Sequence, residues 1–260
     1  MREKNLTMSL QLSVVIITYN EQRNIARCLD SVLPVADEIV VVDSFSTDDT
    51  EKICSKYNVK FLQHPFEGHI EQKNYALAQA QFDYVLSLDA DEALSETLSQ
   101  EIKNIKTHCE KDAYSFNRLT NFCGQWIKHC GWYPDKKTRL WNKNKGKWGG
   151  VNPHDKVMMQ QNASTQHINA DILHYSFNSI DEHLKQIAYF TDISSKAAFE
   201  KGKRSTNFKI AYKTGFKFLR DYILKLGFLD GKYGFIICKN SAYAKFLKYS
   251  KLKKLHQNNF

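Results

Sequence analysis

The sequence predicts an α/β protein with a Rossmann-like, mostly parallel central sheet flanked by helices. Short apolar runs rich in β-branched residues alternate with amphipathic segments through about the first ninety residues. Each connection between these runs is long enough for a right-handed crossover between parallel strands. With 260 residues, of which 42% are hydrophobic, the chain can bury one large core and carry a small appended region.

Four apolar runs are expected to form strands, at residues 12–18, 38–43, 59–63 and 84–89. Helices are expected between them, at about residues 24–35, 47–57 and 70–81. The second of these helices has a start signal, because Ser46-Thr47-Asp48-Asp49 has the Ser-x-x-Asp form of a capping box. The alternation therefore predicts three βα units followed by a fourth strand.

A further helix is expected from about Ser95 to His108, after which the sequence becomes aromatic and irregular. This stretch favours loops and short strands, with most of its rings in the core; the rings are Phe116, Phe122, Trp126, Trp132, Tyr133, Trp141 and Trp148. Helices are then expected at residues 180–201, 208–226 and 233–255. The segment Gly227-Phe228-Leu229-Asp230-Gly231 separates the last two.

Positive charge is concentrated at the C-terminus. Residues 201–260 contain fifteen Lys and Arg residues but two acidic residues, whereas the whole chain has a net charge of +9. We therefore predict a catalytic domain at residues 1–200 and a basic, aromatic, helical extension at residues 201–260. The six cysteines form no CxxC pair and no regular pattern, so neither a zinc ribbon nor a disulfide framework is indicated, and a reducing cytoplasm fits best.

Polar side chains follow three of the expected strands, in Thr18-Tyr19-Asn20-Glu21, Asp43-Ser44 and Asp89-Ala90-Asp91. In open α/β sheets ligands bind beyond the C-terminal ends of the strands, so these groups should converge on one site. An Asp-x-Asp sequence offers hard oxygen ligands to a divalent cation that can hold a diphosphate. Taken alone, the same motif is equally typical of an acidic turn after a strand.

Two other classes of protein share some of these features. A nucleotidyltransferase that makes sugar nucleotides would also use paired aspartates on an α/β fold, but it should have a glycine-rich loop after the first strand, and residues 18–26 contain no glycine. A nucleic-acid-binding protein would explain the basic, aromatic C-terminus. It would leave the acidic residues at the strand ends unexplained, because carboxylates repel phosphates, and we expect no nucleic-acid partner.

The segments Val14 to Glu21, Val41 to Asp48 and Leu88 to Glu92 together resemble the family 2 glycosyltransferases. Later motifs are similar to the subgroup that adds sugars to the lipopolysaccharide inner core; they are Trp132-Tyr133-Pro134-Asp135, Arg139-Leu140-Trp141, Pro153-His154-Asp155 and His174-Tyr175-Ser176. That subgroup commonly has His-Glu where this chain has His154-Asp155.

The resemblance implies a GT-A fold, a nucleotide-diphosphate sugar donor and a divalent metal, Mg²⁺ or Mn²⁺. By position in the family pattern, Thr18 and Glu21 line the nucleotide pocket, and Asp43 accepts a hydrogen bond from a uracil-type base. Lys73 and Asn74 correspond to a pair near the donor. Asp89 faces the ribose side and Ala90 belongs to the nucleotide-sugar site, Asp91 binds the metal, and His174 is a further contact to metal or diphosphate. A histidine after an apolar strand is also often a hydrogen-bonded structural residue.

The implied reaction is an inverting transfer of a sugar, with uridine diphosphate glucose as the preferred donor and a lipopolysaccharide core or other cell-surface glycan as acceptor. An inverting transfer needs a carboxylate that takes a proton from the attacking hydroxyl. Asp155 is the first candidate for this base and Asp135 the second, although both also have the surroundings of turn residues.

The C-terminal extension suggests a membrane partner. Twelve Phe and Tyr residues interleave with its fifteen cations, a composition suited to an anionic leaflet that carries a lipid-linked acceptor. Because no run approaches the ~20 apolar residues of a bilayer span, we expect a cytoplasmic protein bound peripherally to the inner face of the cytoplasmic membrane. Alternatively, the rings pack on the catalytic domain and the lysines form a solvated face.

Overall fold

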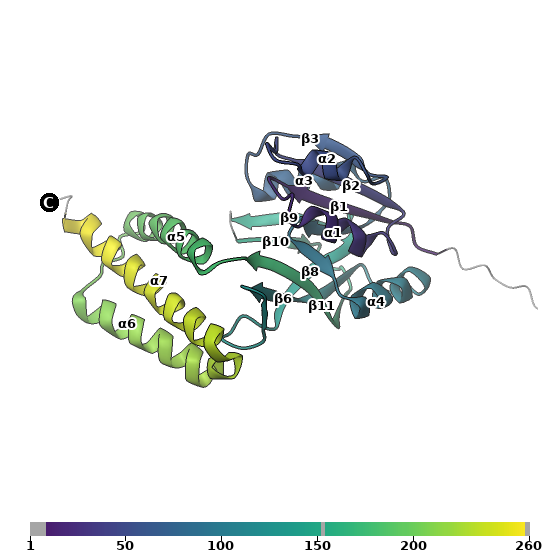
Figure 1. The fold of residues 1–260 in the computed structure, drawn as a ribbon. Helices are drawn as coiled ribbons and strands as arrows, with labels where there is room; N and C mark the ends of the chain where they lie inside the picture. The colour runs from purple at the N-terminus through teal and green to yellow at the C-terminus, as the bar shows by residue number, and fades with distance from the viewer. Residues whose placement is uncertain (1–8, 152–153, 258–260) are drawn as a thin grey trace, which may run out of the picture. The chain divides into compact units, whose positions relative to one another are not determined.

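The structure is a computed structural model, and it describes residues 9–151 and 154–257, with only the backbone of His154 (Figure 1). These residues form two compact units. The first contains residues up to 118 together with residues 135–174, and the second contains residues 119–134 and the chain from residue 175 onward. The domain boundary after residue 200 stays a prediction.

Four parallel strands form the N-terminal half of the sheet in the order β3-β2-β1-β4. The predicted runs match them closely: β1 is Leu12–Thr18, β2 is Glu38–Asp43, β3 is Lys60–Gln63 and β4 is Tyr84–Asp89. The register pairs Thr18 with Asp43 and Ile17 with Asp89. The C-terminal ends of β1, β2 and β4 are therefore level, and the polar residues that follow them start at the same edge of the sheet.

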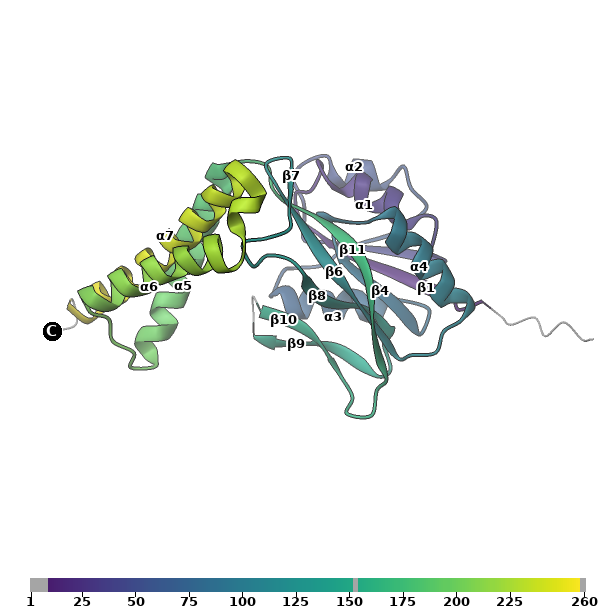
Figure 2. The ribbon, with the colours of Figure 1, turned by 90° about the horizontal axis from the view of Figure 1, so that it is seen from below.

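The sheet continues beyond β4 through β8, β6, β11 and β5. These strands are Asp135–Asn142, Ala113–Phe122, Thr165–Phe177 and Glu92–Leu94, and the β4–β8, β8–β6 and β11–β5 pairs are antiparallel. Figure 2 shows β6 and β11 as long strands, so the expectation of loops and short strands was wrong here. Polar residues inside them hide the strand pattern because they bond to one another: Asn117 Nδ2 donates to Asn169 Oδ1 at 2.9 Å, and Ser115 Oγ lies 3.1 Å from His167 Nδ1.

Helices cover both faces of the first unit's sheet. On one face, α1 (Ile25–Val32), α2 (Thr50–Cys54) and α4 (Glu96–Thr107) pack on the core. On the other, α3 (His69–Gln79) packs with the separate hairpin of β9 (Gly146–Val151) and β10 (His154–Met159). Rings fill this core as expected, since Phe116 and Trp141 are fully buried and Trp148 is 4% exposed.

The helix α2 is shorter than predicted, because the expected capping residues have another role. Ser46 Oγ accepts a hydrogen bond from Asn20 N at 2.8 Å, and Asp48 Oδ2 accepts one from Gln22 N at 3.1 Å. In return, Thr47 N donates to Asn20 Oδ1 at 2.8 Å. The helix therefore begins at Thr50, and residues 46–48 fasten the loop after β1 to the loop after β2.

The second unit is mostly helical. It contains β7 (Gln125–Ile127), which pairs with the end of β6, and the helices α5 (Ile180–Glu200), α6 (Asn207–Leu219) and α7 (Gly231–Gln257). Figure 1 shows α7 beside both α5 and α6. A π-helical turn at Arg220–Leu224 and a 3₁₀ turn at Gly227–Asp230 connect α6 to α7. In the described part of the chain, no helix combines the length and hydropathy needed to span a bilayer.

The 3₁₀ turn depends on a close backbone approach and a buried carboxylate. Gly234 lies so near the carbonyl oxygen of Gly227 that a Cβ atom at Gly234 would overlap it. The Asp230 carboxylate accepts hydrogen bonds from His129 N at 2.8 Å and contacts His129 Nδ1 at 2.9 Å. These contacts fix the start of α7 within the second unit.

Candidate active site

A first cleft of about 290 Å³ opens at the C-terminal ends of β1, β2 and β4. It brings together six of the residues singled out in the sequence, which are Thr18, Glu21, Asp89, Ala90, Asp91 and His174. It also contains Tyr19 and Ser44, which belong to the polar segments expected to converge here, and Phe66 and His69, which sequence reasoning missed. Phe66 and His69 lie at the start of α3, and no local motif marks them.

Thr18 lines this cleft, and its hydroxyl group is unsatisfied within the described part of the chain. The side chain is buried, and its Oγ1 atom has no hydrogen-bond partner among the described residues. A buried polar atom left without a partner is costly. The contact of Thr18 with a nucleotide stays a prediction.

Glu21 has a strongly perturbed carboxyl group. Burial raises its pKa from 4.5 to about 7, and the neighbouring charges of Asp91 and Asp48 act in the same direction. A hydrogen bond of 2.7 Å from Asn24 Nδ2 opposes this rise. The first cleft thus contains a carboxyl group that titrates near neutral pH.

Asp91 and His174 form the part of this cleft that best fits a metal. Asp91 Oδ2 lies 3.1 Å from His174 Nε2, and the two side chains are 25% and 15% exposed. No group of three or more His, Cys, Asp or Glu residues suited to a metal occurs in residues 9–151 and 154–257. Mg²⁺ is commonly bound by one or two carboxylates and completes its shell with substrate phosphates and water, so the Asp91 carboxylate fits a cation shared with a diphosphate.

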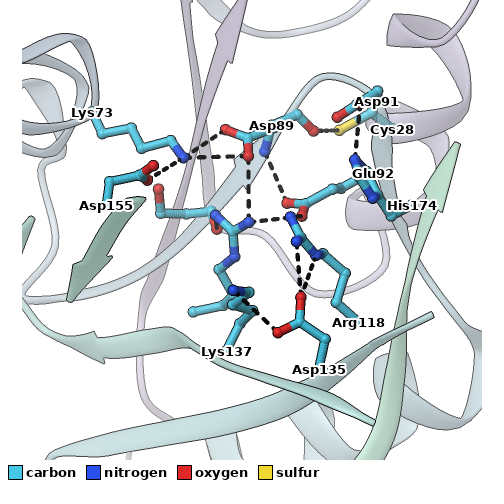
Figure 3. Close-up of polar contacts among 12 residues, drawn as sticks. Cys28, Lys73, Asp89, Asp91, Glu92, Arg118, Asp135, Lys137, Asp155 and His174 are labelled. Atoms are coloured by element: carbon cyan, nitrogen blue, oxygen red, sulfur yellow. Dashed lines mark hydrogen bonds and ion pairs between the residues drawn. The ribbon is translucent and has the colours of Figure 1, made fainter. Parts of the chain in front are cut away.

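Asp89 belongs to a different set of contacts from Asp91. Figure 3 shows its carboxylate facing Lys73. Lys73 Nζ donates to Oδ2 at 3.3 Å and lies 3.0 Å from Oδ1, and Arg139 Nη2 lies 3.3 Å from Oδ2. Burial alone would raise the pKa of Asp89, but the charges of Lys73 and Arg139 outweigh it and hold that pKa far below its usual value. The two aspartates of the motif therefore have different partners.

Arg139, one of the two cations beside Asp89, is itself held by Glu92. Arg139 Nη2 lies 2.7 Å from Glu92 Oε1, and Glu92 Oε2 accepts a hydrogen bond from Asp89 N at 3.1 Å. Both side chains are buried. Glu92 and Arg139 were missed as site residues, although each lies in a motif that the sequence analysis quoted.

A second cleft, of about 590 Å³, shares Asp89 with the first. Lys73 and Asp155 line it, and Lys73 Nζ lies 2.8 Å from Asp155 Oδ2. Asp135 is absent from the described lining; its carboxylate pairs with Arg118 at 2.8 Å and with Lys137 at 3.1 Å. Of the two candidate bases, Asp155 is the one that borders the cleft.

Two residues predicted to contact the donor, Asp43 and Asn74, do not line either cleft among the described residues. Each bonds to another part of the protein. Asp43 is fully buried, and its carboxylate accepts hydrogen bonds from the backbone N, at 2.8 Å, and the hydroxyl of Ser46. The Asn74 amide pairs at 3.0 Å with both the N and the O of Trp148, which fastens β9 to α3. Their donor contacts stay predictions, and Pro153 of the quoted motif lies outside the described residues.

Residues 13–224 match the Glycosyl transferase family 2, which together with the α/β fold and the two clefts shows that the chain belongs to this family. It is a glycosyltransferase with a GT-A fold, as the sequence motifs predicted. Family membership sets aside the nucleotidyltransferase and the nucleic-acid-binding protein as principal functions.

Relatives cover nearly the whole chain. An uncharacterised glycosyltransferase of Rickettsia prowazekii is 31% identical over 94% of this chain and 87% of its own length. The lipopolysaccharide core biosynthesis glycosyltransferase LpsC of Rhizobium meliloti is 26% identical over 95% of this chain and 93% of its own length. Among solved structures, TarS 1–349 of Staphylococcus aureus matches with a TM-score of 0.43 and 18% identity, covering 96% of this chain and 92% of that one.

Proposed function

We propose that this chain is a metal-dependent, inverting glycosyltransferase that moves a sugar, glucose by preference, from a nucleoside-diphosphate sugar to a lipopolysaccharide-core or related glycan. The observation that carries the proposal is the meeting of two clefts at Asp89, one containing Asp91 and His174 and the other containing Asp155. A transfer reaction needs a donor site next to an acceptor site, and two clefts that share a residue meet this need. The likeness to LpsC supports the class of acceptor.

The donor occupies the first cleft in this proposal. Thr18 offers an unpartnered hydroxyl to the nucleotide, and Asp91 with His174 would hold Mg²⁺ or Mn²⁺. The cation, when bound, neutralises charge that grows on the leaving diphosphate. Lys73 lies next to the junction of the clefts and adds positive charge there, which stabilises the transition state more than the ground state.

Asp155 is the proposed base. The acceptor hydroxyl gives its proton to the Asp155 carboxylate while its oxygen bonds to the anomeric carbon, and the bond from that carbon to the diphosphate oxygen breaks on the opposite face. The contact with Lys73 holds the carboxylate at the edge of the cleft. Asp135, which is absent from the described lining and pairs with Arg118 and Lys137, is the second choice.

A donor panel monitored by release of nucleoside diphosphate tests this function. We expect release from uridine diphosphate glucose that stops when a chelator is added. Asp155→Asn should nearly abolish transfer while leaving binding of uridine diphosphate intact, and Asp135→Asn serves as the matched variant. Turnover of Asp155→Asn within a few-fold of wild type would show that another group is the base, and chelator-resistant release would exclude the metal.

We further propose that the second unit contacts an anionic membrane surface, which makes the protein peripheral on the inner face of the cytoplasmic membrane. One side of α6 exposes apolar residues at helical spacing: Phe208, Tyr212, Phe216 and Leu219 are 81%, 52%, 46% and 53% exposed. Consecutive rings along this stripe stack on one another. Lysines lie between them in the sequence, as in helices that bind a bilayer interface.

Flotation with vesicles tests this contact. Wild type should float with vesicles containing anionic phospholipid and float less as salt is raised, because charge attraction is screened. The double variant Phe208→Ser/Phe216→Ser should stay in the fraction that does not float. Leu33→Ser, at a 49% exposed position in the first unit, should float like wild type. Equal flotation of the two variants would contradict the proposal.

A further inference from the structure

The lining of the second cleft is strongly basic, and this feature is not needed to bind a neutral sugar. Six cations line it against two carboxylates, Asp89 and Asp155; the cations are Lys73, Arg118, Lys136, Lys137, Arg139 and Lys156. We propose that this cleft is an acceptor subsite for a sugar that carries a phosphate or carboxylate group close to the reacting hydroxyl. The inference rests on the proposed function, since it names the chemical class of the acceptor.

Most of these cations have acidic partners, but two lysines do not. Lys73 and Arg139 are paired within the Asp89 network, and Arg118 and Lys137 share Asp135. Lys136, on β8, and Lys156, on β10, are exposed, and their side chains make no hydrogen bond or ion pair with another described residue. The positive charge of these two lysines is therefore free to act on a ligand in the cleft.

Two buried donors in the same lining also need an acceptor. Arg139 and Trp148 are 2% and 4% exposed, and Arg139 Nε and Trp148 Nε1 have no hydrogen-bond partner in the described part of the chain. Both groups donate and cannot accept. Leaving a buried donor unpaired costs free energy, so a ligand that brings oxygen atoms to these positions gains affinity.

The chemistry of the ligand follows from these four groups. Phosphate and carboxylate oxygens accept several charge-assisted hydrogen bonds at once, whereas a neutral sugar would leave the lysine charges unmatched. The proposed base Asp155 lies in the same lining, so the charged group and the attacking hydroxyl belong to one sugar or to adjacent sugars. The cleft's volume of about 590 Å³, twice that of the first cleft, leaves room for a sugar with such a substituent.

Calorimetry with glucose, glucose 6-phosphate and glucuronic acid, on the full chain saturated with uridine diphosphate and Mg²⁺, tests the proposal. At least one charged sugar should bind about tenfold more tightly than glucose, and the preference should weaken with added salt. Comparison of the two charged sugars shows whether phosphate or carboxylate is the preferred group. Equal affinity for all three sugars, or no binding of either charged sugar, would overturn the inference.

Matched variants locate the site. Lys136→Ala/Lys156→Ala should weaken binding of the charged sugar about tenfold, because two charged contacts are lost. Lys103→Ala/Lys147→Ala removes the same charge from exposed positions on α4 and β9 outside the lining, and should change affinity less than twofold. Trp148→Phe keeps a ring but removes the Nε1 donor, and should also weaken binding. If the Lys136→Ala/Lys156→Ala variant prefers the charged sugar over glucose as strongly as wild type does, these lysines do not bind the charged group.

The affinity for uridine diphosphate separates this inference from the proposed function. Wild type that fails to bind uridine diphosphate contradicts the proposed function itself. Intact nucleotide binding without a preference for charged sugars contradicts only the acceptor assignment. If the charged sugar binds to the chain free of uridine diphosphate but not to the saturated chain, the anion occupies the donor's phosphate position, and the acceptor assignment is wrong.

Discussion

Replacement of Glu21 by Gln should make the protein more stable at pH 8 and change its stability little at pH 4. The Glu21 carboxyl has its pKa raised from 4.5 to about 7, chiefly by burial, so the folded state holds its proton more tightly than the unfolded state does. The contribution of Glu21 to the stability of wild type therefore falls as the pH rises from 4.5 through about 7, and the full cost remains above that range. Gln has no charge to bury, and its side-chain oxygen can still accept the hydrogen bond from Asn24.

The size of the effect follows from the pKa. A rise in the pKa from 4.5 to about 7 means that ionising Glu21 costs roughly 3 kcal/mol more in the folded state than in the unfolded state. Because Glu21 lines an open cleft, solvent screens part of this cost, and we expect a gain of about 1 to 2 kcal/mol at pH 8.

Urea denaturation of both proteins at pH 4 and pH 8, with chelator present, measures the difference. The same exchange at exposed Glu67 should alter stability by less than about 0.5 kcal/mol at either pH. A gain for Glu21→Gln that is equal at the two pH values, or a loss at pH 8, would refute the reasoning.

Three further predictions concern other parts of the molecule. Asp91→Asn should weaken metal-dependent binding of uridine diphosphate at least about tenfold in calorimetry, because it removes the carboxylate beside His174, and an unchanged chelator effect would contradict this. Lys73→Met should cost about 3 kcal/mol in urea denaturation, because it removes a buried partner of two carboxylates; a loss under about 1 kcal/mol would show that Asp89 and Asp155 are otherwise satisfied. Gly234→Ala should lower the free energy of unfolding by more than about 2 kcal/mol, and with it the thermal midpoint, because a Cβ atom has no space beside Gly227. A wild-type midpoint would contradict that packing.

Local sequence patterns were sufficient for the elements and for much of the first cleft. The runs at residues 12–18, 38–43 and 84–89 are strands with the predicted bounds, because continuous β-branched residues buried on both faces have few alternatives to a parallel strand. Since parallel strands end at one edge, the motifs containing Thr18 and Asp91 could be placed near each other without a structure. The motif Ser46 to Asp49 was misread because its side chains bond across to another loop, which local pattern cannot show.

The partners of the charged residues were decided by the tertiary structure. The Asp-x-Asp motif looks like one ligand pair in sequence, but Asp89 contacts Lys73 and Arg139 while Asp91 contacts His174. Those partners lie between 16 and 83 positions away along the chain. Electrostatic partners depend on distances of a few ångströms and on burial, and neither is encoded in local periodicity. The sequence by itself thus determined the parallel strands, the sheet edge at which the first cleft opens, and the family. The packing of β8, β9 and β10 against α3 and β4 determined the second, basic cleft.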